Sequence, residues 1–174
     1  MARLTPSRGI KDARMWASLD PTRKYRYSLG RMVSDLDGTV CFILLNPSTA
    51  DSEYDDATVR RCIGFCQDWG FGNLQIVNLF SLRATSPKKL HRARNPVGKL
   101  GDSSITAACK TSHRIVAGWG NHGGLRARSS EVLKLLFPFR EKLFCFGLTS
   151  LGEPRHPLYL KKTALLIPFG RLPL

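Results

Sequence analysis

The sequence predicts an α/β fold, a three-layer sandwich with a central and mostly parallel sheet. Short apolar segments alternate along the chain with segments of helical period, which is typical of a parallel sheet covered by helices on both faces. Residues 39–45 (TVCFILL) are continuously apolar, as expected for a central strand that is buried on both faces. A chain of 174 residues has the size of one domain with one core.

The first part of the chain predicts an arm followed by two strands. Residues 1–24 are polar and basic, and we expect a basic N-terminal arm or a loose helix there. The α/β domain then spans residues 25–174. It begins with strands at 25–31 and 39–45, and the sequence SDLDG at 34–38 is typical of the turn between them.

The rest of the chain predicts alternating helices and strands. A helix is expected at 57–69, because Asp55 or Asp56 can cap its first turn and Gly70 can end it. A strand at 74–79 and a long basic loop at 81–101 follow. The later elements are a helix at 102–110, a strand at 114–119, a helix at 130–137, a strand at 142–146 and a last strand at 163–168.

The charge of the chain points to a polyanionic partner. Lys and Arg number 27 against 13 Asp and Glu, which gives a net charge of +14. A basic surface of this size attracts polyanions, of which nucleic acid is the commonest, and the alternative is a protein that is merely basic. We expect no membrane partner and a cytoplasmic location, because no apolar run is long enough to span a bilayer and no signal peptide is recognisable.

The cysteines predict no metal centre. There are five, an odd number without a C-x-x-C pair, which suits unpaired thiols in a reducing compartment. Cys62 and Cys66 stand four apart on the helix expected at 57–69, and they suit either half of a metal site or two small core residues. No second pair or suitable histidine follows them, which favours the core.

Polar residues gather where the expected strands end. In an open α/β sheet, ligands bind at the carboxyl ends of the strands. The four segments in question are 46–48 (NPS), Asn78, 119–122 (WGNH) and 149–159. Together they bring amides, a histidine and carboxylates to one edge of the sheet, where we expect Asn46, Asn78 and His156 around a single crevice.

The same segments carry a family resemblance. They read LLNPSTAD at 44–51, DDAT at 55–58, NLFSLRATSP at 78–87, GWGNHG at 118–123 and RHPLYL at 155–160. In this order they resemble an uncharacterised domain family of bacteria and phages. The order is also similar to that of the uracil-DNA glycosylase superfamily, although Leu158 stands where that superfamily has a serine after His-Pro.

The resemblance to the glycosylases implies a fold, an activity and roles for single residues. It implies a uracil-DNA glycosylase-like sandwich and a DNA glycosylase, a hydrolase that cleaves the N-glycosyl bond without a metal or other cofactor; we also expect a monomer. Asn46 matches the residue that positions the attacking water, and Asn78 matches the amide that reads the pyrimidine edge. His156 matches the histidine of the His-Pro loop, and Leu158 or Tyr159 matches the wedge that follows it.

Release of a nucleobase requires a hydrogen-bond donor to the departing base and a proton acceptor for the attacking water. The departing base becomes negative, and His156 can stabilise it by a hydrogen bond. The water needs a proton acceptor, which an amide such as Asn46 is not, so Asp51, Asp55 or Asp56 is expected to help. We favour Asp56 as the catalytic carboxylate, and a helix cap is the alternative for Asp55 and Asp56.

Release of a base from double-stranded DNA also requires residues that bind the phosphate backbone. A base in double-stranded DNA must be flipped out before an enzyme can reach it. We expect Arg83 near the substrate and a set of basic residues on the DNA backbone, with a solvated surface as the alternative for each of them. The set is Lys88, Lys89, Arg92, Arg94, Arg155, Lys161 and Lys162.

The size of Ser48 predicts the class of base. In the uracil-specific relatives, a tyrosine at the matching position closes the pocket against substituents at C5 of the pyrimidine. Ser48 leaves room there, which predicts removal of a C5-modified pyrimidine and a role in defence against phages with modified DNA. The alternatives are a repair glycosylase for uracil or mismatched bases, a non-catalytic module that binds DNA or a modified base, and an enzyme on free nucleotides or RNA.

Overall fold

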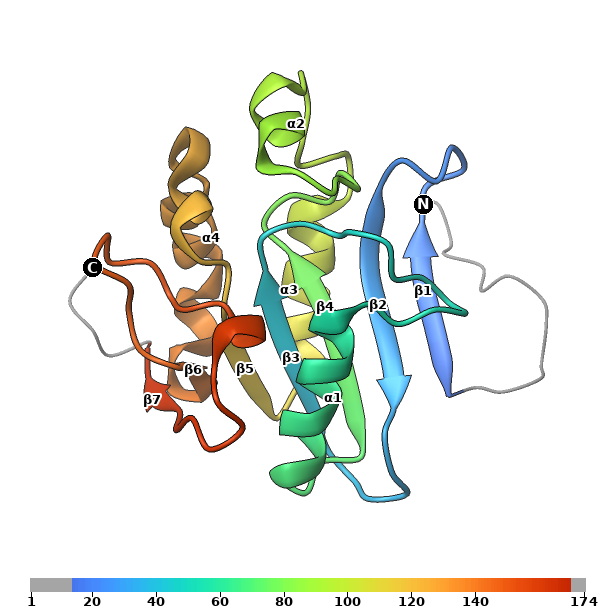
Figure 1. Cartoon of the computed structure of the whole chain (residues 1–174), viewed down its shortest axis with the longest axis vertical. Coiled ribbons are helices and arrows are strands. Elements are labelled where there is room, and N and C mark those ends of the chain that lie inside the picture. Colours follow the sequence, from blue (N-terminus) through green and yellow to red (C-terminus); the bar gives the residue numbers. More distant parts are fainter. Residues whose placement is uncertain (1–13, 170–174) are drawn as a thin grey trace.

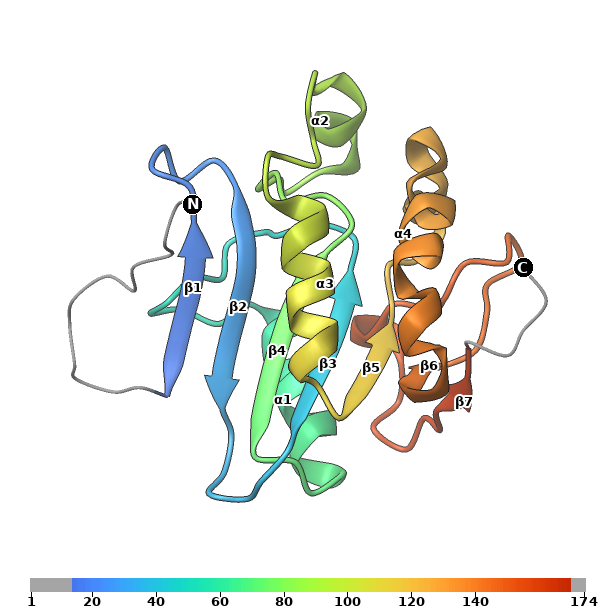
Figure 2. The ribbon, with the colours of Figure 1, turned by 180° about the vertical axis from the view of Figure 1, so that it is seen from behind.

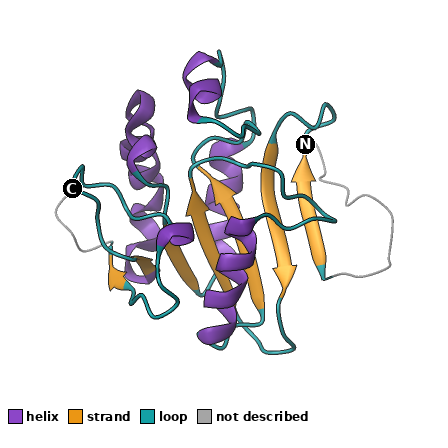
Figure 3. Cartoon of the chain, in the orientation of Figure 1, coloured by secondary structure: helices purple, strands orange, loops and turns teal. Residues whose placement is uncertain are grey.

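The computed structural model describes residues 14–169 as an α/β structure with a seven-stranded mixed sheet and helices on both faces (Figures 1, 2 and 3). The strand order is β1-β2-β4-β3-β5-β6-β7, and neighbours in the run from β4 to β6 are parallel. The strands are β1 (Met15–Leu19), β2 (Arg26–Met32), β3 (Thr39–Leu44), β4 (Asn73–Asn78), β5 (Arg114–Ala117), β6 (Leu143–Cys145) and β7 (Ile167–Pro168). The coarse fold class expected from the sequence is therefore confirmed, with antiparallel strands at both edges.

The helices form two layers, one on each face of the sheet. The α-helices are α1 (Ala57–Asp68), α2 (Pro87–Arg92), α3 (Gly101–Thr111) and α4 (Arg128–Leu136). The 3₁₀ segments are η1 (Asn121–Ala127), η2 (Phe137–Lys142) and η3 (Pro157–Tyr159). In Figure 1, α1 and η3 lie in front of the sheet, and Figure 2 shows α3 and α4 covering the opposite face.

The alternation of side chains along β3 supplies both cores. Val40 and Phe42 face α1 and pack in the cluster that contains Cys62 and Cys66 of that helix. Cys41 and Ile43 face the other way, into the cluster built by α3 and α4. This two-sided burial is why residues 39–45 are apolar without interruption. All of these residues are inaccessible to solvent, so the two thiols of α1 are core residues in this structure.

The expectation of an arm over residues 1–24 is wrong for its second half. Residues 15–19 form β1, which pairs antiparallel with β2 at the edge of the sheet. Trp16 explains the pairing, because its ring covers Gly30 of β2 so closely that a Cβ there would lie 2.1 Å from the indole. Residues 1–13 lie outside the described residues.

The expected turn between the first two domain strands does not make a hairpin. β4 lies between β2 and β3, pairing antiparallel with the first and parallel with the second. The segment 34–38 instead crosses the start of β4 at Gly72, where a Cβ would lie 1.5 Å from the carbonyl oxygen of Leu36. Two smaller differences are that α2 forms inside the expected basic loop and that β7 is only two residues long.

Candidate functional site

The connections of the parallel strands locate a switch point at β3 and β5. After β3 the chain passes over the α1 face to β4, and after β5 it passes over the opposite face, through α4, to β6. Ligands of open α/β sheets bind outside the carboxyl ends of strands at such a switch point. Asn46 follows β3, and Trp119 and Gly120 follow β5. Asn78 ends the neighbouring β4, level with Leu44 of β3.

Asn46 is held in one orientation by the loop that follows β4. Its Nδ2 donates to the carbonyl oxygens of Pro47, at 2.9 Å, and of Ala84, at 2.6 Å. Ala84 returns a bond from its backbone N–H to the Pro47 carbonyl oxygen at 2.9 Å. Because both partners of Nδ2 are acceptors, Oδ1 faces away from them, and it has no partner among residues 14–169. This oxygen is free to accept a hydrogen bond from a water or a ligand.

Asn78 is buried and held by an arginine that the sequence analysis did not single out. Arg26 Nη2 donates to Asn78 Oδ1 at 3.3 Å, and Nη1 donates to the Ala50 carbonyl oxygen at 2.8 Å. Both side chains are only 3% exposed, and burial lowers the pKa of the guanidinium to about 10, so Arg26 stays charged at neutral pH. The amide of Asn78 therefore turns its oxygen to Arg26 and its Nδ2 away from it, and it cannot rotate freely as an unrestrained amide would.

His156 is a neutral hydrogen-bond donor at neutral pH. Its Nδ1 accepts the backbone N–H of Leu158 at 3.3 Å and caps η3, so the proton of the neutral ring sits on Nε2. Burial lowers the pKa of His156 to about 4, and the charge of Asp56 opposes that shift. Asp56 is thus close enough to act on the histidine, and Nε2–H has no partner among the described residues.

The His-Pro loop is seated on the end of β5 by two glycines. A Cβ at Gly118 would lie 2.9 Å from Pro157 Cδ, so no larger residue fits there without a shift. Gly120 has a φ of +68°, in the left-handed region that favours glycine, and its N–H donates to the Pro154 carbonyl oxygen at 2.8 Å. The WG segment and the His-Pro loop, far apart in sequence, therefore meet at the switch point.

The three candidate carboxylates have different surroundings. Asp55 pairs with Arg31, whose side chain is 2% exposed, over 2.7 Å from Nη2 to Oδ1. Asp51 accepts backbone N–H groups of Glu53 and Tyr54, which lower its pKa together with the charges of nearby arginines. Both carboxylates therefore serve to hold the loop in shape.

Asp56 combines a cap with a free oxygen. Its Oδ1 accepts the Val59 N–H at 2.9 Å and caps α1, as the sequence allows. Its Oδ2 has no hydrogen-bond partner among residues 14–169, and its charge acts on both His156 and Arg26. Among the three candidates, Asp56 is the carboxylate whose charge acts on the histidine.

An arginine clamp, made by Arg26, Arg31 and Arg83, holds the loop between β3 and α1. Arg26 donates to the carbonyl oxygen of residue 50, and Arg31 donates to those of residues 51 and 54. Arg83 donates to those of Ser48, at 3.4 Å, and of residue 49, at 3.3 Å. In this structure Arg83 therefore holds the same loop as Arg26 and Arg31 do. The clamp fixes the loop that carries both Asn46 and Asp56.

The remaining expected contacts lie at the surface around the switch point. Ser48 is half-buried, and its hydroxyl has no partner in the described part of the chain. Tyr159 is 82% exposed and its ring is tilted against His156, at 5.7 Å between centroids, whereas Leu158 is half-buried. Of the two residues expected as a wedge, Tyr159 is therefore the more exposed.

The expected DNA-contacting residues form two exposed groups. Lys88, Lys89, Arg92 and Arg94 belong to α2 and its end, and α2 lies beyond the carboxyl ends of β3 and β4 (Figure 1). Arg155, Lys161 and Lys162 flank η3 and are also exposed. No helix of residues 14–169 is long and apolar enough to cross a membrane.

A family model described as "Protein of unknown function (DUF1643)" matches residues 26–158. The chain belongs to the DUF1643 family. No curated protein and no solved structure matches it.

The DUF1643 match starts at Arg26 and ends at Leu158. It therefore contains the arginine clamp, both asparagines, Asp56 and His156, and it leaves the edge strands β1 and β7 outside. The family description names no activity.

The low pKa of His156 predicts a loss of stability in mild acid. The unfolded chain binds a proton below a pKa of 6.5, whereas the folded protein does not bind it until about 4. Stability is therefore lost as the pH falls from 6.5 to 4, by about 3 kcal/mol from this group. The variant His156→Asn keeps a capping side chain and lacks the titration. Thermal unfolding of both proteins at pH 7 and pH 4.5 should show a larger decrease for the wild type; equal decreases would contradict the assignment.

Proposed function

We propose that this DUF1643 protein is a DNA glycosylase that flips a pyrimidine out of DNA and hydrolyses its N-glycosyl bond. The observation that carries the proposal is a neutral histidine donor, His156, within the electrostatic reach of Asp56, a carboxylate that keeps one oxygen without a partner in the described part of the chain. Asn46 adds an amide oxygen without a partner among the described residues, and Asn78 adds an amide nitrogen that is turned away from Arg26. The excess of basic residues supports a nucleic acid as the partner.

Each residue has one task in the proposed reaction. A water held by Asn46 Oδ1 gives a proton to Asp56 and attacks C1′ of the sugar, while the bond from C1′ to the base breaks. The bonding electrons leave with the base, which becomes an anion, and His156 Nε2–H donates a hydrogen bond to it. Asn78 Nδ2 donates to an acceptor on the edge of the base. The base anion then takes up a proton from the solvent and Asp56 gives its proton back to the solvent, so the products are the free base and an abasic site.

We further propose that the base carries a substituent at C5. The support is the small side chain of Ser48, whose hydroxyl is free to bind a polar substituent. Large polar C5 groups occur on the cytosines of some phage genomes, so the reaction would damage phage DNA and serve in antiviral defence. A site with this much room also admits uracil or a mismatched base, which is the repair alternative.

A second candidate function is binding without cleavage. The observation that favours it is that Asp56 already caps α1, so its carboxylate has a structural task as well. An amide at position 46 cannot take the proton of the water in its place. Such a module would recognise DNA or a modified base through the same amides and histidine.

Abasic-site formation on three DNA substrates tests these proposals. Unmodified DNA, uracil-containing DNA and phage DNA with hydroxymethylated or glycosylated cytosines are incubated with the protein, and strand breaks at abasic sites are counted on gels. We expect more breaks in the modified DNA than in either of the other two substrates. A Ser48→Tyr variant, whose ring would occupy the C5 space, should lose this activity.

The other outcomes separate the alternatives. Efficient cleavage of uracil DNA with none of modified DNA would refute the argument from Ser48 and favour repair. Binding of modified DNA without any abasic site would favour the binding module.

A further inference from the structure

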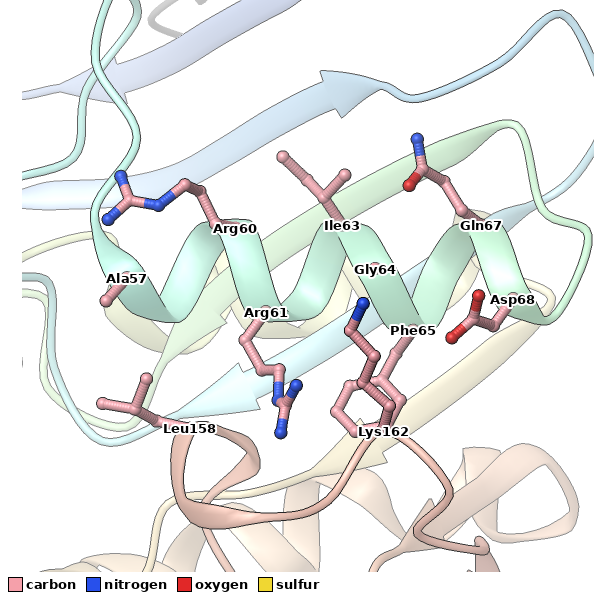
Figure 4. Close-up of a pocket in the computed structure, with 10 residues that line it drawn as sticks. All are labelled: Ala57, Arg60, Arg61, Ile63, Gly64, Phe65, Gln67, Asp68, Leu158 and Lys162. Carbon is pink, nitrogen blue, oxygen red and sulfur yellow. The ribbon is translucent and has the colours of Figure 1, made fainter.

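A groove outside the strand-end cluster runs along α1. This α1 groove has a volume of about 530 Å³ and is lined by Arg60, Arg61, Gly64, Leu158 and Lys162 among others (Figure 4). One wall is the outward face of α1, and the other is the segment from η3 to Lys162. None of the arginines in it belongs to the clamp or to the basic groups that the sequence singled out.

The charge of the α1 groove suits a polyanion. Arg60, Arg61 and Lys162 bring three positive charges, and Asp68 brings one negative charge at the end away from Leu158 (Figure 4). Guanidinium and ammonium groups are the side chains that contact phosphate oxygens most often. A small anionic ligand would need an enclosed pocket, whereas this groove has two walls only and follows a helix.

Arg61 is positioned before any ligand arrives. Its Nη2 donates to the Leu160 carbonyl oxygen, and its guanidinium lies 5.5 Å from the centroid of the Phe65 ring. Its Nε is buried and has no partner among the described residues. Arg60 is also held by a backbone carbonyl group, because its Nη1 donates to the Asp55 carbonyl oxygen at 2.5 Å. Both guanidinium groups are thus tied at one nitrogen and keep further N–H donors for a phosphate.

Two residues that line the α1 groove, Ala57 and Leu158, are close in sequence to the proposed catalytic residues Asp56 and His156. Leu158 lines the groove and is two residues from His156, whose Nδ1 accepts the Leu158 N–H. Asp56 caps the same helix whose outward face forms the wall. A DNA strand whose base reaches His156 therefore has its next phosphates near the groove.

We propose that the α1 groove holds the phosphodiester backbone of the DNA strand beside the flipped nucleotide. The inference rests on the proposed function for the identity of the strand. It adds Arg60 and Arg61 as phosphate-contacting residues of that site and places Lys162, already expected on the DNA backbone, in the same groove.

Gly64 allows a test that leaves the arginines in place. It lies in the middle of α1, and a Cβ built on it meets no atom within 4 Å. Gly64→Glu should therefore place a negative charge in the groove without a steric clash, and Gly64→Gln is the matched neutral variant. Both substitutions remove a glycine from a helix interior, so neither should lower the thermal midpoint.

The measurement is binding of a labelled double-stranded DNA oligomer by fluorescence anisotropy. We expect Gly64→Glu to weaken binding about tenfold or more, because like charges in an interface repel, and Gly64→Gln to bind about as the wild type does. The double variant Arg60→Gln and Lys162→Gln should also have a shallower slope of log affinity against log salt concentration. The decrease should correspond to the loss of up to about two phosphate contacts.

The results can refute DNA binding by the α1 groove and the proposed glycosylase reaction independently of each other. Equal DNA affinity of Gly64→Glu and Gly64→Gln, with base release by the wild type intact, would overturn the groove and leave the proposed function standing. A wild type that releases no base from any DNA, with Gly64→Glu alone weakened in binding, would overturn the glycosylase proposal and retain the groove as a DNA contact.

Discussion

Replacing Asp56 by asparagine is expected to lower the rate of base release by about 10²- to 10⁴-fold, the usual contribution of a general base. The effect arises because the Oδ2 that is free in the structure would become an amide nitrogen, which cannot accept the proton of the water. Asparagine caps helices as well as aspartate does, so the Val59 N–H keeps its acceptor and the free energy of unfolding should change little. Single-turnover base release on modified DNA and thermal unfolding measure the two quantities.

Asp55 provides the matched control at the next residue. Asp55→Asn removes the negative charge that pairs with Arg31. The free energy of unfolding should fall by about 1–3 kcal/mol, because the buried Arg31 guanidinium would then donate to a neutral amide in place of a carboxylate. Base release by the folded fraction should remain within about tenfold of the wild type, since Asp55 has a loop-holding task in the structure. The opposite pattern, with Asp55→Asn inactive and Asp56→Asn active, would exchange the two roles and refute the assignment.

The elements with strong local signals were predictable from the sequence, and their neighbours in the sheet were not. Residues 39–45 and 57–69 match β3 and α1 because burial on two faces and a helical period leave plain marks in the sequence. The position of β4 between β2 and β3 depends on long-range pairing, which no turn sequence reports. β1 was missed because its five residues (MWASL) lie in an otherwise basic segment and are too few to show a strand pattern before their partner is known.

The candidate site could be proposed from the sequence where it depends on strand ends. Asn46, Asn78 and His156 could be proposed because parallel strands bring their carboxyl ends to one edge. Arg26 and Arg31 were missed because arginine is rarely buried, and only the tertiary structure shows that they hold the carbonyl groups of one loop. The signal that could have indicated them is two arginines inside a predicted strand, YRYSLGR, in a chain with the carboxylate-rich segment DSEYDD.

His156 is the second residue whose replacement should have a large effect, and His156→Asn isolates its donor. The asparagine oxygen can keep the cap on the Leu158 N–H, while the Nε2–H that faces no protein partner is lost. Removal of one donor to a developing anion costs about 10²- to 10³-fold in rate. We expect a loss of that size in single-turnover base release, with DNA affinity nearly unchanged, because the bond to the base strengthens only as the base becomes negative.

The pH profile decides whether the donor is neutral. Because burial lowers the pKa of His156 to about 4, the ring keeps one charge state from pH 8 down to about pH 5. The ratio of the wild-type rate to the His156→Asn rate should therefore stay constant over that range, since other titrating groups act on both proteins. An imidazolium donor would behave differently, with a ratio that falls tenfold for each pH unit above its pKa. A ratio that declines between pH 6 and 8 would refute the neutral donor and, with it, the reading of Nδ1 as a cap.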